Sequence, residues 1–183
     1  MKPSDAVAAA VEAAPGDLFV SSLGTATSAL RLASGDGPHL YLGGAMGCGL
    51  AAALGVAERC PDRGVVAVVG DGDLLMGAGS LWSLSGLRPT NLLLLLLDDG
   101  RYSITGGQDL VAPRAFAAVA GALPNVTALE AATAGRASVR TASPTSPAVL
   151  LAQIDEPAWP GPSPFVDPHR VRARFAANAR GVS

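Results

Sequence analysis

The sequence predicts an α/β domain of three layers (α/β/α), with a mainly parallel sheet between two layers of helices. Short apolar runs alternate with helical stretches along most of the chain, as in consecutive βαβ units. Two runs, Val65 to Val69 and Leu92 to Leu97, are apolar at every position, which is typical of strands buried on both faces. Each of them ends at a turn built from Asp and Gly. Because ligands of parallel sheets bind at the carboxyl ends of strands, we expect a binding site there.

Further elements follow from the same alternation. Asp17 to Ser22 is expected as a short strand and Ala148 to Ile154 as the last one. The leucine run alone fits either a helix or a strand, but its length and its flanking turn residues favour a strand. Helices are expected near Ala29 to Ala33 and over Leu50 to Arg59, Leu74 to Leu87, Phe116 to Ala122 and Arg170 to Ala179.

Residues 1–183 are expected to form a single domain. A chain of this length can bury a sizeable core and is too short for two domains of ordinary size. Its least regular part is the proline-rich stretch at about 156–168, which precedes a closing helix at about 170–179.

Composition excludes several classes of function. Charged residues make up only 15% of the chain and hydrophobic residues 49%. Either a face is buried against a permanent partner subunit or the chain has a general bias toward Ala and Gly, and both explanations stay open. The formal net charge of -2 argues against nucleic acid, and no apolar run is long enough to cross a membrane. Two cysteines without a metal or disulfide pattern, and an N-terminus without an apolar signal core, predict a cytoplasmic protein.

Two acidic turns form the strongest chemical pattern. Gly70-Asp71-Gly72 follows one buried strand and Asp98-Asp99-Gly100 follows the next, with the expected crossover helix between them. Their carboxylates should therefore meet at one edge of the sheet. Carboxylate and main-chain oxygens suit Mg²⁺, whose shell is commonly completed by phosphate oxygens and water. The glycines would let the backbone approach a phosphate closely.

These turns carry a resemblance to a known family. GDG at 70–72 and an acidic pair at 98–99, at the family's spacing, form the thiamine-diphosphate signature. The longer string GDGDLLMGAGSLWSLSGLRPTNLLLLLLDDGRYSITGGQ closely resembles the cofactor subunit or domain of phosphonopyruvate and sulfopyruvate decarboxylases. The similarity extends upstream through YLGGAMG and covers most of the chain.

The resemblance implies a role for each matching residue. The metal, Mg²⁺, would be held by Asp71, Asp99 and the main-chain oxygen of Arg101. Met46 would be the wedge that bends thiamine diphosphate, and Gln108 would belong to the loop over the active site. The cofactor itself would contact Thr25, Thr27, Ser28, Gly44, Met46, Gly70, Gly72, Asp73 and Tyr102.

Three departures from the family pattern matter. The family usually has Asn where Asp99 stands and a small neutral residue where Asp73 stands. Both changes add negative charge near a diphosphate. The first loop, Gly24 to Leu30, also lacks the Arg-Glu pair that is frequent in the family.

The family's activating glutamate lies on a separate pyrimidine-binding domain. The glutamates of this chain are expected in helical or tail segments, so the resemblance implies that a partner subunit supplies the catalytic one. They are Glu12, Glu58, Glu130 and Glu156.

The implied function is the diphosphate- and metal-binding subunit of a heteromeric decarboxylase for a small acidic 2-oxo acid. Two alternatives remain: a subunit of a carboligase of the acetolactate- or acyloin-synthase kind, and a non-catalytic scaffold subunit.

Three other residues have simpler expected places. Trp82 is expected in the core, His39 in a solvated loop, and Cys48 as a small buried thiol.

Overall fold

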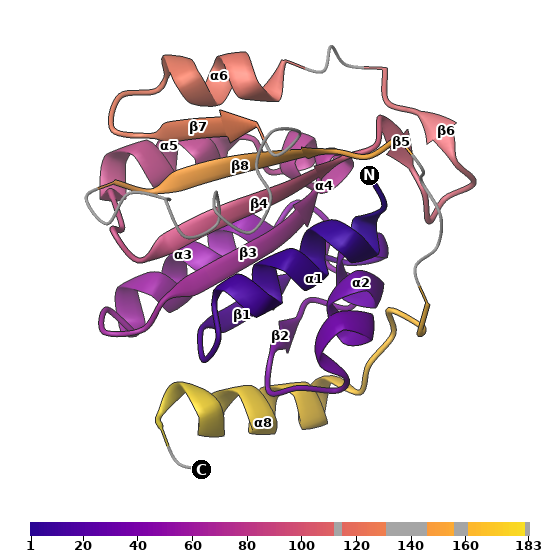
Figure 1. Cartoon of the computed structure of the whole chain (residues 1–183), viewed down its shortest axis with the longest axis vertical. Helices are drawn as coiled ribbons and strands as arrows, with labels where there is room; N and C mark the ends of the chain where they lie inside the picture. The colour runs from indigo at the N-terminus through magenta and orange to yellow at the C-terminus, as the bar shows by residue number, and fades with distance from the viewer. Residues whose placement is uncertain (112–114, 131–145, 156–160, 182–183) are drawn as a thin grey trace.

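The computed structural model describes residues 1–111, 115–130, 146–155 and 161–181. Within them, six parallel strands form one sheet in the order β2-β1-β3-β4-β8-β7, with helices on both faces (Figure 1). The predicted three-layer α/β/α class is therefore confirmed. The strands are β1 (Leu18–Ser21), β2 (Leu40–Tyr41), β3 (Val65–Gly70), β4 (Leu92–Asp98), β7 (Thr127–Glu130) and β8 (Ala148–Gln153).

Two hydrophobic cores lie on opposite faces of the sheet, because successive side chains of a strand point to opposite faces. Val66 and Val68 pack into one core, whereas Val65, Ala67 and Val69 pack into the other. The first core is covered by α1 (Pro3–Ala13) and α2 (Thr25–Ser34). The second is covered by α3 (Gly49–Arg59), α4 (Asp71–Met76), α5 (Gly79–Leu87) and α6 (Phe116–Ala122).

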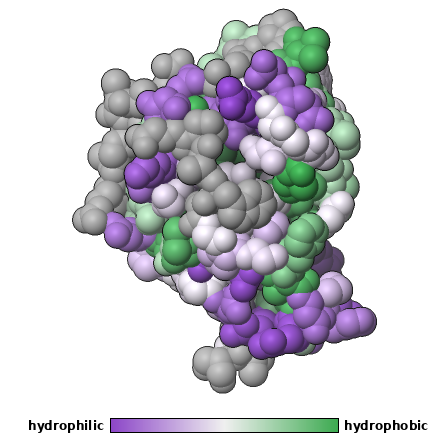
Figure 2. Space-filling view, turned by 90° about the vertical axis from the view of Figure 1, so that its right-hand side faces the viewer, coloured by the Kyte–Doolittle hydropathy of each residue, from purple (hydrophilic) through white to green (hydrophobic). Residues whose placement is uncertain are grey.

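The closing helix α8 (Pro168–Ala179) wraps the β2 edge of the sheet. Its Val171 belongs to the first core and its Phe175 contacts the second. The outer face of α8 carries exposed Arg170, Arg172 and Arg174, and hydrophilic residues gather at this lower end of the molecule in Figure 2.

The order of the strands positions the site. From β1 the chain passes to β2 on one side and then returns to β3 on the other, which makes the β1–β3 boundary a topological switch point. β3 and β4 are paired in register from Val65↔Leu92 to Gly70↔Leu97. The two acidic turns therefore leave the sheet at the same edge, as the sequence predicts.

One predicted helix is two helices. The stretch Leu74 to Leu87 divides into α4 and α5 around Gly77, where α4 touches the turn before α3. A Cβ atom on Gly77 would lie 2.1 Å from the carbonyl oxygen of Gly47. This close backbone contact comes from tertiary packing, and the apolar pattern of the stretch does not reveal it.

Several elements were not predicted: α1, β2, β7 and a small hairpin of β5 (Arg101–Tyr102) and β6 (Gln108–Asp109). The first five residues of the expected proline-rich stretch, 156–160, lie outside the described residues. No helix in the described part of the chain combines the length and the apolar character needed to span a membrane.

Three side chains lie elsewhere than expected. Trp82 is 59% exposed, because it points outward from α5 while Leu81 and Leu84 fill the core. His39 is buried, with its ring edge-on to Phe19 at 5.2 Å between centroids. Cys48 is exposed, at the residue before α3.

Candidate cofactor and metal site

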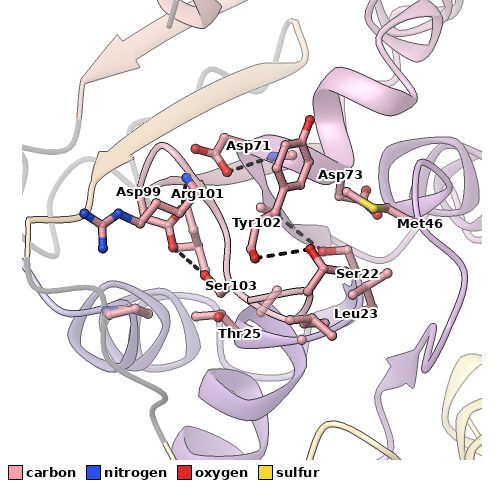
Figure 3. Close-up of a pocket in the computed structure, with 18 of the residues that line it drawn as sticks. Ser22, Leu23, Thr25, Met46, Asp71, Asp73, Asp99, Arg101, Tyr102 and Ser103 are labelled. Atoms are coloured by element: carbon pink, nitrogen blue, oxygen red, sulfur yellow. Dashed lines mark hydrogen bonds between the residues drawn. The ribbon is translucent and has the colours of Figure 1, made fainter. Parts of the chain in front are cut away.

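A pocket of about 270 Å³ opens at the carboxyl edge of the sheet, over the switch point. The loops that follow β1, β3 and β4 line it, together with the turn that carries Met46 (Figure 3). Of the residues predicted for the site, it brings together Thr25, Gly44, Met46, Gly70, Asp71, Gly72, Asp73, Asp99, Arg101 and Tyr102.

Asp71 is the most buried charge in the pocket, at 2% exposure. It stands at the first position of α4, where β3 has just ended. Its Oδ1 accepts a hydrogen bond from Gly72 N at 2.7 Å and its Oδ2 one from Gly100 N at 2.6 Å. Asp71 thus links the two acidic turns directly. Burial raises the pKa of Asp71 to about 6, and nearby Asp99 adds to the rise, although the N–H groups of Gly100 and Gly72 oppose it.

Asp99 lies on the more open side of the pocket. Its Oδ1 accepts from Arg101 N at 2.8 Å and its Oδ2 from the Ser103 hydroxyl at 3.0 Å. The Arg101 guanidinium points away from the pocket in Figure 3, and its Nε lies 3.6 Å from Asp109 Oδ1 across the hairpin. Arg101 therefore meets the pocket chiefly through its backbone, as the implied main-chain ligand requires.

Gly72 lies beneath two side chains. A Cβ at this position would come within 2.8 Å of Tyr102 Cε1 and 3.3 Å of Met46 Cε. A larger residue would therefore displace the tyrosine ring or the methionine methyl. The absence of a side chain keeps the backbone of the GDG turn within reach of a bound group.

Asp73 has a place that the sequence did not indicate. It is 6% exposed, and its carboxylate accepts from Gly47 N at 2.8 Å and from Gly49 N at 3.3 Å. Burial raises its pKa, and these two N–H groups oppose the rise. The Asp73 side chain thus holds the turn before α3.

The hydroxyls at the start of α2 divide into two groups. Thr25 lines the pocket. The Thr27 hydroxyl is buried and donates to Ser22 O at 2.6 Å, and the Ser28 hydroxyl donates to Pro162 O at 2.7 Å. Neither Thr27 nor Ser28 lines the pocket, so of the three only Thr25 stays a candidate contact.

The loop between β5 and β6 folds over the pocket. Ile104 covers the start of α2 so closely that a Cβ on Gly24 would lie 2.5 Å from its Cδ1. Thr105 also lines the pocket. Gln108 is exposed beyond this loop, where its Oε1 accepts from the Thr105 hydroxyl at 3.1 Å, and it is not among the lining residues.

Several pocket residues were missed by sequence reasoning: Ser22, Leu23, Ser103, Ile104 and Thr105. Ser22 follows β1, and its Oγ accepts from Gly70 N at 3.3 Å, which ties the first strand end to the third. Position at the end of a buried strand was a usable indication for Ser22. Nothing in the local pattern marks Ile104.

The donor set fits a hard divalent cation. Two carboxylates and a backbone segment line one side of the pocket, and each carboxylate oxygen can accept a further ligand beside the hydrogen bond it already has. Within the described residues, no cluster of three or more His, Cys, Asp or Glu side chains could hold a metal by itself. Such an ion would need main-chain or non-protein oxygens to complete its shell.

Three of the four glutamates lie within the described part of the chain. Glu12 is in α1 and Glu58 in α3, as expected, but Glu130 ends strand β7 rather than lying in a helix or tail. β7 is the edge strand, and β8 and β4 separate it from β3. Glu156 lies outside the described residues.

A parallel sheet with paired carboxylates and a glycine cradle at its switch point defines a domain built to bind a phosphorylated cofactor. Residues 23–158 match the family described as thiamine pyrophosphate enzyme, C-terminal TPP binding domain. The chain belongs to this family.

Two kinds of relatives agree with the family. The chain is 35% identical to a phosphonopyruvate decarboxylase of Streptomyces hygroscopicus over 178 residues, covering 90% of this chain and 42% of the relative. It is 33% identical to sulfopyruvate decarboxylase subunit beta of Methanocaldococcus jannaschii over 92 residues, covering 50% and 48%. The chain thus spans less than half of each of these relatives.

Solved structures show the same fold. A 4-hydroxybenzoylformate decarboxylase of Rhodococcus jostii matches with a TM-score of 0.67 at 22% identity, covering 85% of this chain and 33% of that one. A 2-oxoglutarate:ferredoxin oxidoreductase of Magnetococcus marinus matches with a TM-score of 0.61 at 17% identity, covering 92% and 66%.

Proposed function

We propose that this chain is the diphosphate- and metal-binding subunit of a heteromeric thiamine-diphosphate-dependent decarboxylase acting on a small acidic 2-oxo acid. The observation that carries the proposal is the convergence of Asp71, Asp99, Gly72 and Met46 on one pocket at the switch point of the sheet. The two kinds of relatives, named for phosphonopyruvate and sulfopyruvate decarboxylation, support the reaction and the substrate class.

In this proposal Asp71, Asp99 and the Arg101 carbonyl hold Mg²⁺, and the cation holds the diphosphate. A bound divalent ion favours the ionised form of a buried carboxylate, so it would stabilise Asp71 as the anion despite its burial. Thr25 and the backbone at Gly70 and Gly72 complete the diphosphate site.

When bound, thiamine diphosphate supplies the electron sink for loss of carbon dioxide. The chain's own residues position it and shield it. Met46 would support the bound cofactor, and Gly44 also lines the pocket. Tyr102 and Ile104 cover the opening and would exclude water from the reacting centre.

The acidic group of the substrate needs a cation to bind it. Arg101 is the one basic residue in the described lining of the pocket, and its guanidinium pairs with Asp109 outside it. We therefore assign recognition of the acidic group mainly to the metal and to the partner subunit.

A partner subunit would also supply the activating glutamate. The face formed by α3, α4 and α5 suits such a partner, because exposed Met76, Trp82 and Leu87 lie there. No charged residue occurs in 40–57 or 74–87, whereas the outer face of α8 is rich in arginine. We name residues 45, 48, 51, 55, 76, 79, 82, 83, 86 and 87, all exposed, the uncharged face. A surface without charges that exposes large apolar side chains is typical of interfaces, which supports the proposal of a partner here.

The test is reconstitution of the chain with a candidate partner that carries a pyrimidine-binding domain. We expect the complex to bind thiamine diphosphate with Mg²⁺ and to release carbon dioxide from phosphonopyruvate or sulfopyruvate, while the single chain stays inactive. Joined products in place of an aldehyde would support the carboligase alternative. A complex that forms but binds no thiamine diphosphate would favour the scaffold alternative and contradict the proposal.

A further inference from the structure

Asp73 is a buried acidic residue, only 6% exposed. Its carboxylate faces the turn before α3, where it accepts from Gly47 N at 2.8 Å and from Gly49 N at 3.3 Å. Asp73 itself lies in the first turn of α4. One buried side chain therefore joins the segment after β3 to the segment that carries Met46.

The turn held by Asp73 has little room to move. Gly47 has a φ of +81°, a conformation that side chains with a Cβ rarely adopt. A Cβ on Gly49 would lie 2.9 Å from Asp73 Oδ2 and 3.0 Å from Val69 Cγ2. On the other side, Gly77 packs directly on the Gly47 carbonyl. The turn before α3 is therefore held on one side by the Gly77 backbone and on the other by the Asp73 carboxylate.

The bond from Gly47 acts on Met46 without an intermediate. The Gly47 N–H belongs to the same planar peptide unit as the Met46 carbonyl, and the two point in opposite directions. By accepting from this N–H, Asp73 sets the orientation of that peptide. The Met46 side chain extends from it into the pocket, where its Cε reaches to 3.3 Å from the Cβ position of Gly72.

We propose that Asp73 is a positioning residue, whose carboxylate clamps the Met46–Gly47 peptide so that Met46 supports the bound cofactor. This role rests on the proposed function. The positioning role also explains why a carboxylate lies so close to the proposed diphosphate site. The two backbone N–H groups stabilise its charge through charge-assisted hydrogen bonds, so its oxygens face the turn.

The first measurement needs no cofactor. Amide hydrogen exchange of Gly47 and Gly49 is followed by NMR in the full chain, its Asp73→Asn variant and its Asp73→Ala variant. We expect exchange at both amides to rise about tenfold or more in Asp73→Ala, which loses both acceptor oxygens. In Asp73→Asn the rise is expected at one of the two amides, because the side-chain amide keeps one acceptor oxygen and turns an NH2 donor toward the other N–H. Asp73→Asn keeps the shape of the side chain and serves if the alanine variant does not fold.

The second measurement is a double-mutant cycle in the reconstituted enzyme. Asp73→Asn should lower kcat about tenfold while the Kd for thiamine diphosphate stays within about threefold, because the metal site is untouched. In a Met46→Ala background the same change should lower kcat by less than about twofold, since Asp73 acts through Met46. Asp62→Asn, at an exposed acid far from the pocket, is the matched control and should change neither quantity.

Unchanged exchange at both Gly47 and Gly49 in Asp73→Ala, or in Asp73→Asn if the alanine variant does not fold, would overturn the clamp. Fully additive losses of kcat in the Met46→Ala background would overturn the positioning role. If the wild-type complex binds no thiamine diphosphate, the proposed function fails and the positioning role fails with it, while the exchange data still decide whether the clamp exists.

Discussion

At the scale of single residues, Asp71 and Asp99 differ in burial and in hydrogen-bond partners, so substitutions at the two positions should have different effects. Asp71 is deeply buried and accepts from two backbone N–H groups, whereas Asp99 lies at the open side of the pocket and accepts from one backbone N–H and the Ser103 hydroxyl. A buried carboxylate of this kind is hard to replace, because the substitute must satisfy the same N–H donors. Asp99 could be exchanged for its neutral isostere with less disturbance.

Substitution of the two residues should separate these roles. We expect Asp71→Ala to weaken binding of thiamine diphosphate with Mg²⁺ at least about 100-fold in the assembled enzyme, because a direct ligand is lost. Asp99→Asn should be tolerated or should bind more tightly, since it removes one negative charge near the diphosphate. Isothermal titration calorimetry checks both. Normal affinity in Asp71→Ala would remove the assigned metal site.

His39 gives a second prediction at this scale. Burial between Phe19 and Tyr41 lowers the pKa of His39 to about 4, and its Nδ1 has no hydrogen-bond partner among the described residues. Its ordinary value is 6.5. The unfolded chain therefore binds this proton more readily, and the contribution of neutral His39 to stability is lost as pH falls from about 6.5 through about 4.

We expect His39→Phe to be less sensitive to acid than the wild type, by up to about 3 kcal/mol in the free energy of unfolding between pH 7 and pH 4. Urea denaturation at a series of pH values measures the difference between the two proteins. Burial raises the pKa of Asp17, Asp71 and Asp73, which acts in the opposite sense, but these groups are present in both. His169→Phe, on exposed α8, is the control. A parallel pH dependence of His39→Phe and wild type would contradict the assignment.

At the scale of elements, the break between α4 and α5 joins the fold to the site. Gly77 ends α4 where a side chain would meet the Gly47 carbonyl oxygen at 2.1 Å. The oxygen belongs to the backbone and the position of a Cβ is fixed by the backbone, so the clash could not be relieved by a rotamer change. The same contact sets the distance between α4 and the Met46 turn. A side chain at Gly77 would therefore push α4 and the Met46 turn apart.

Gly77→Ala should accordingly lower the free energy of unfolding by about 2–3 kcal/mol, as expected for a methyl group forced into a packed site. Gly55→Ala provides the matched control in α3, where a Cβ would meet nothing within 4 Å. It should leave stability unchanged or raise it by about 0.5–1 kcal/mol, because alanine favours the helix. Equal stability of the two variants in urea denaturation would show that the α4–turn contact is looser than described.

At the scale of the whole molecule, we expect the uncharged face to be the surface that binds the partner subunit. Trp82 is its largest side chain and is 59% exposed, so it would anchor a partner subunit. We expect Trp82→Glu to weaken association with the partner at least about 30-fold while the chain keeps its fold, because an exposed side chain costs little to replace.

Pull-down and sedimentation with the purified partner measure this loss, and circular dichroism checks the fold. Leu32→Glu changes a similarly exposed residue, 53% exposed, on α2 across the sheet, and should leave association intact. Unimpaired assembly by Trp82→Glu would place the interface on another face.

Much of the fold was decided by local patterns in the sequence. The all-apolar runs of β3 and β4 predict central strands, because only strands covered on both faces can hide side chains at every position. The same logic places Asp71 and Asp99 at one edge of the sheet, and the pocket contains both. The predicted bounds of α6, Phe116 to Ala122, are the observed ones. The cytoplasmic location and a small acidic 2-oxo acid as the substrate stay predictions.

The tertiary structure alone decided which polar groups face the pocket and which surfaces stay uncovered. Thr25, Thr27 and Ser28 look alike in the sequence, but only packing shows that the last two donate inward. Likewise Asp73 turns to the Gly47 amide, and Trp82 points outward although its neighbours are core. Periodicity reports which positions are apolar, whereas the direction of each side chain depends on contacts between segments far apart in the chain. Those contacts exist only once the chain has folded.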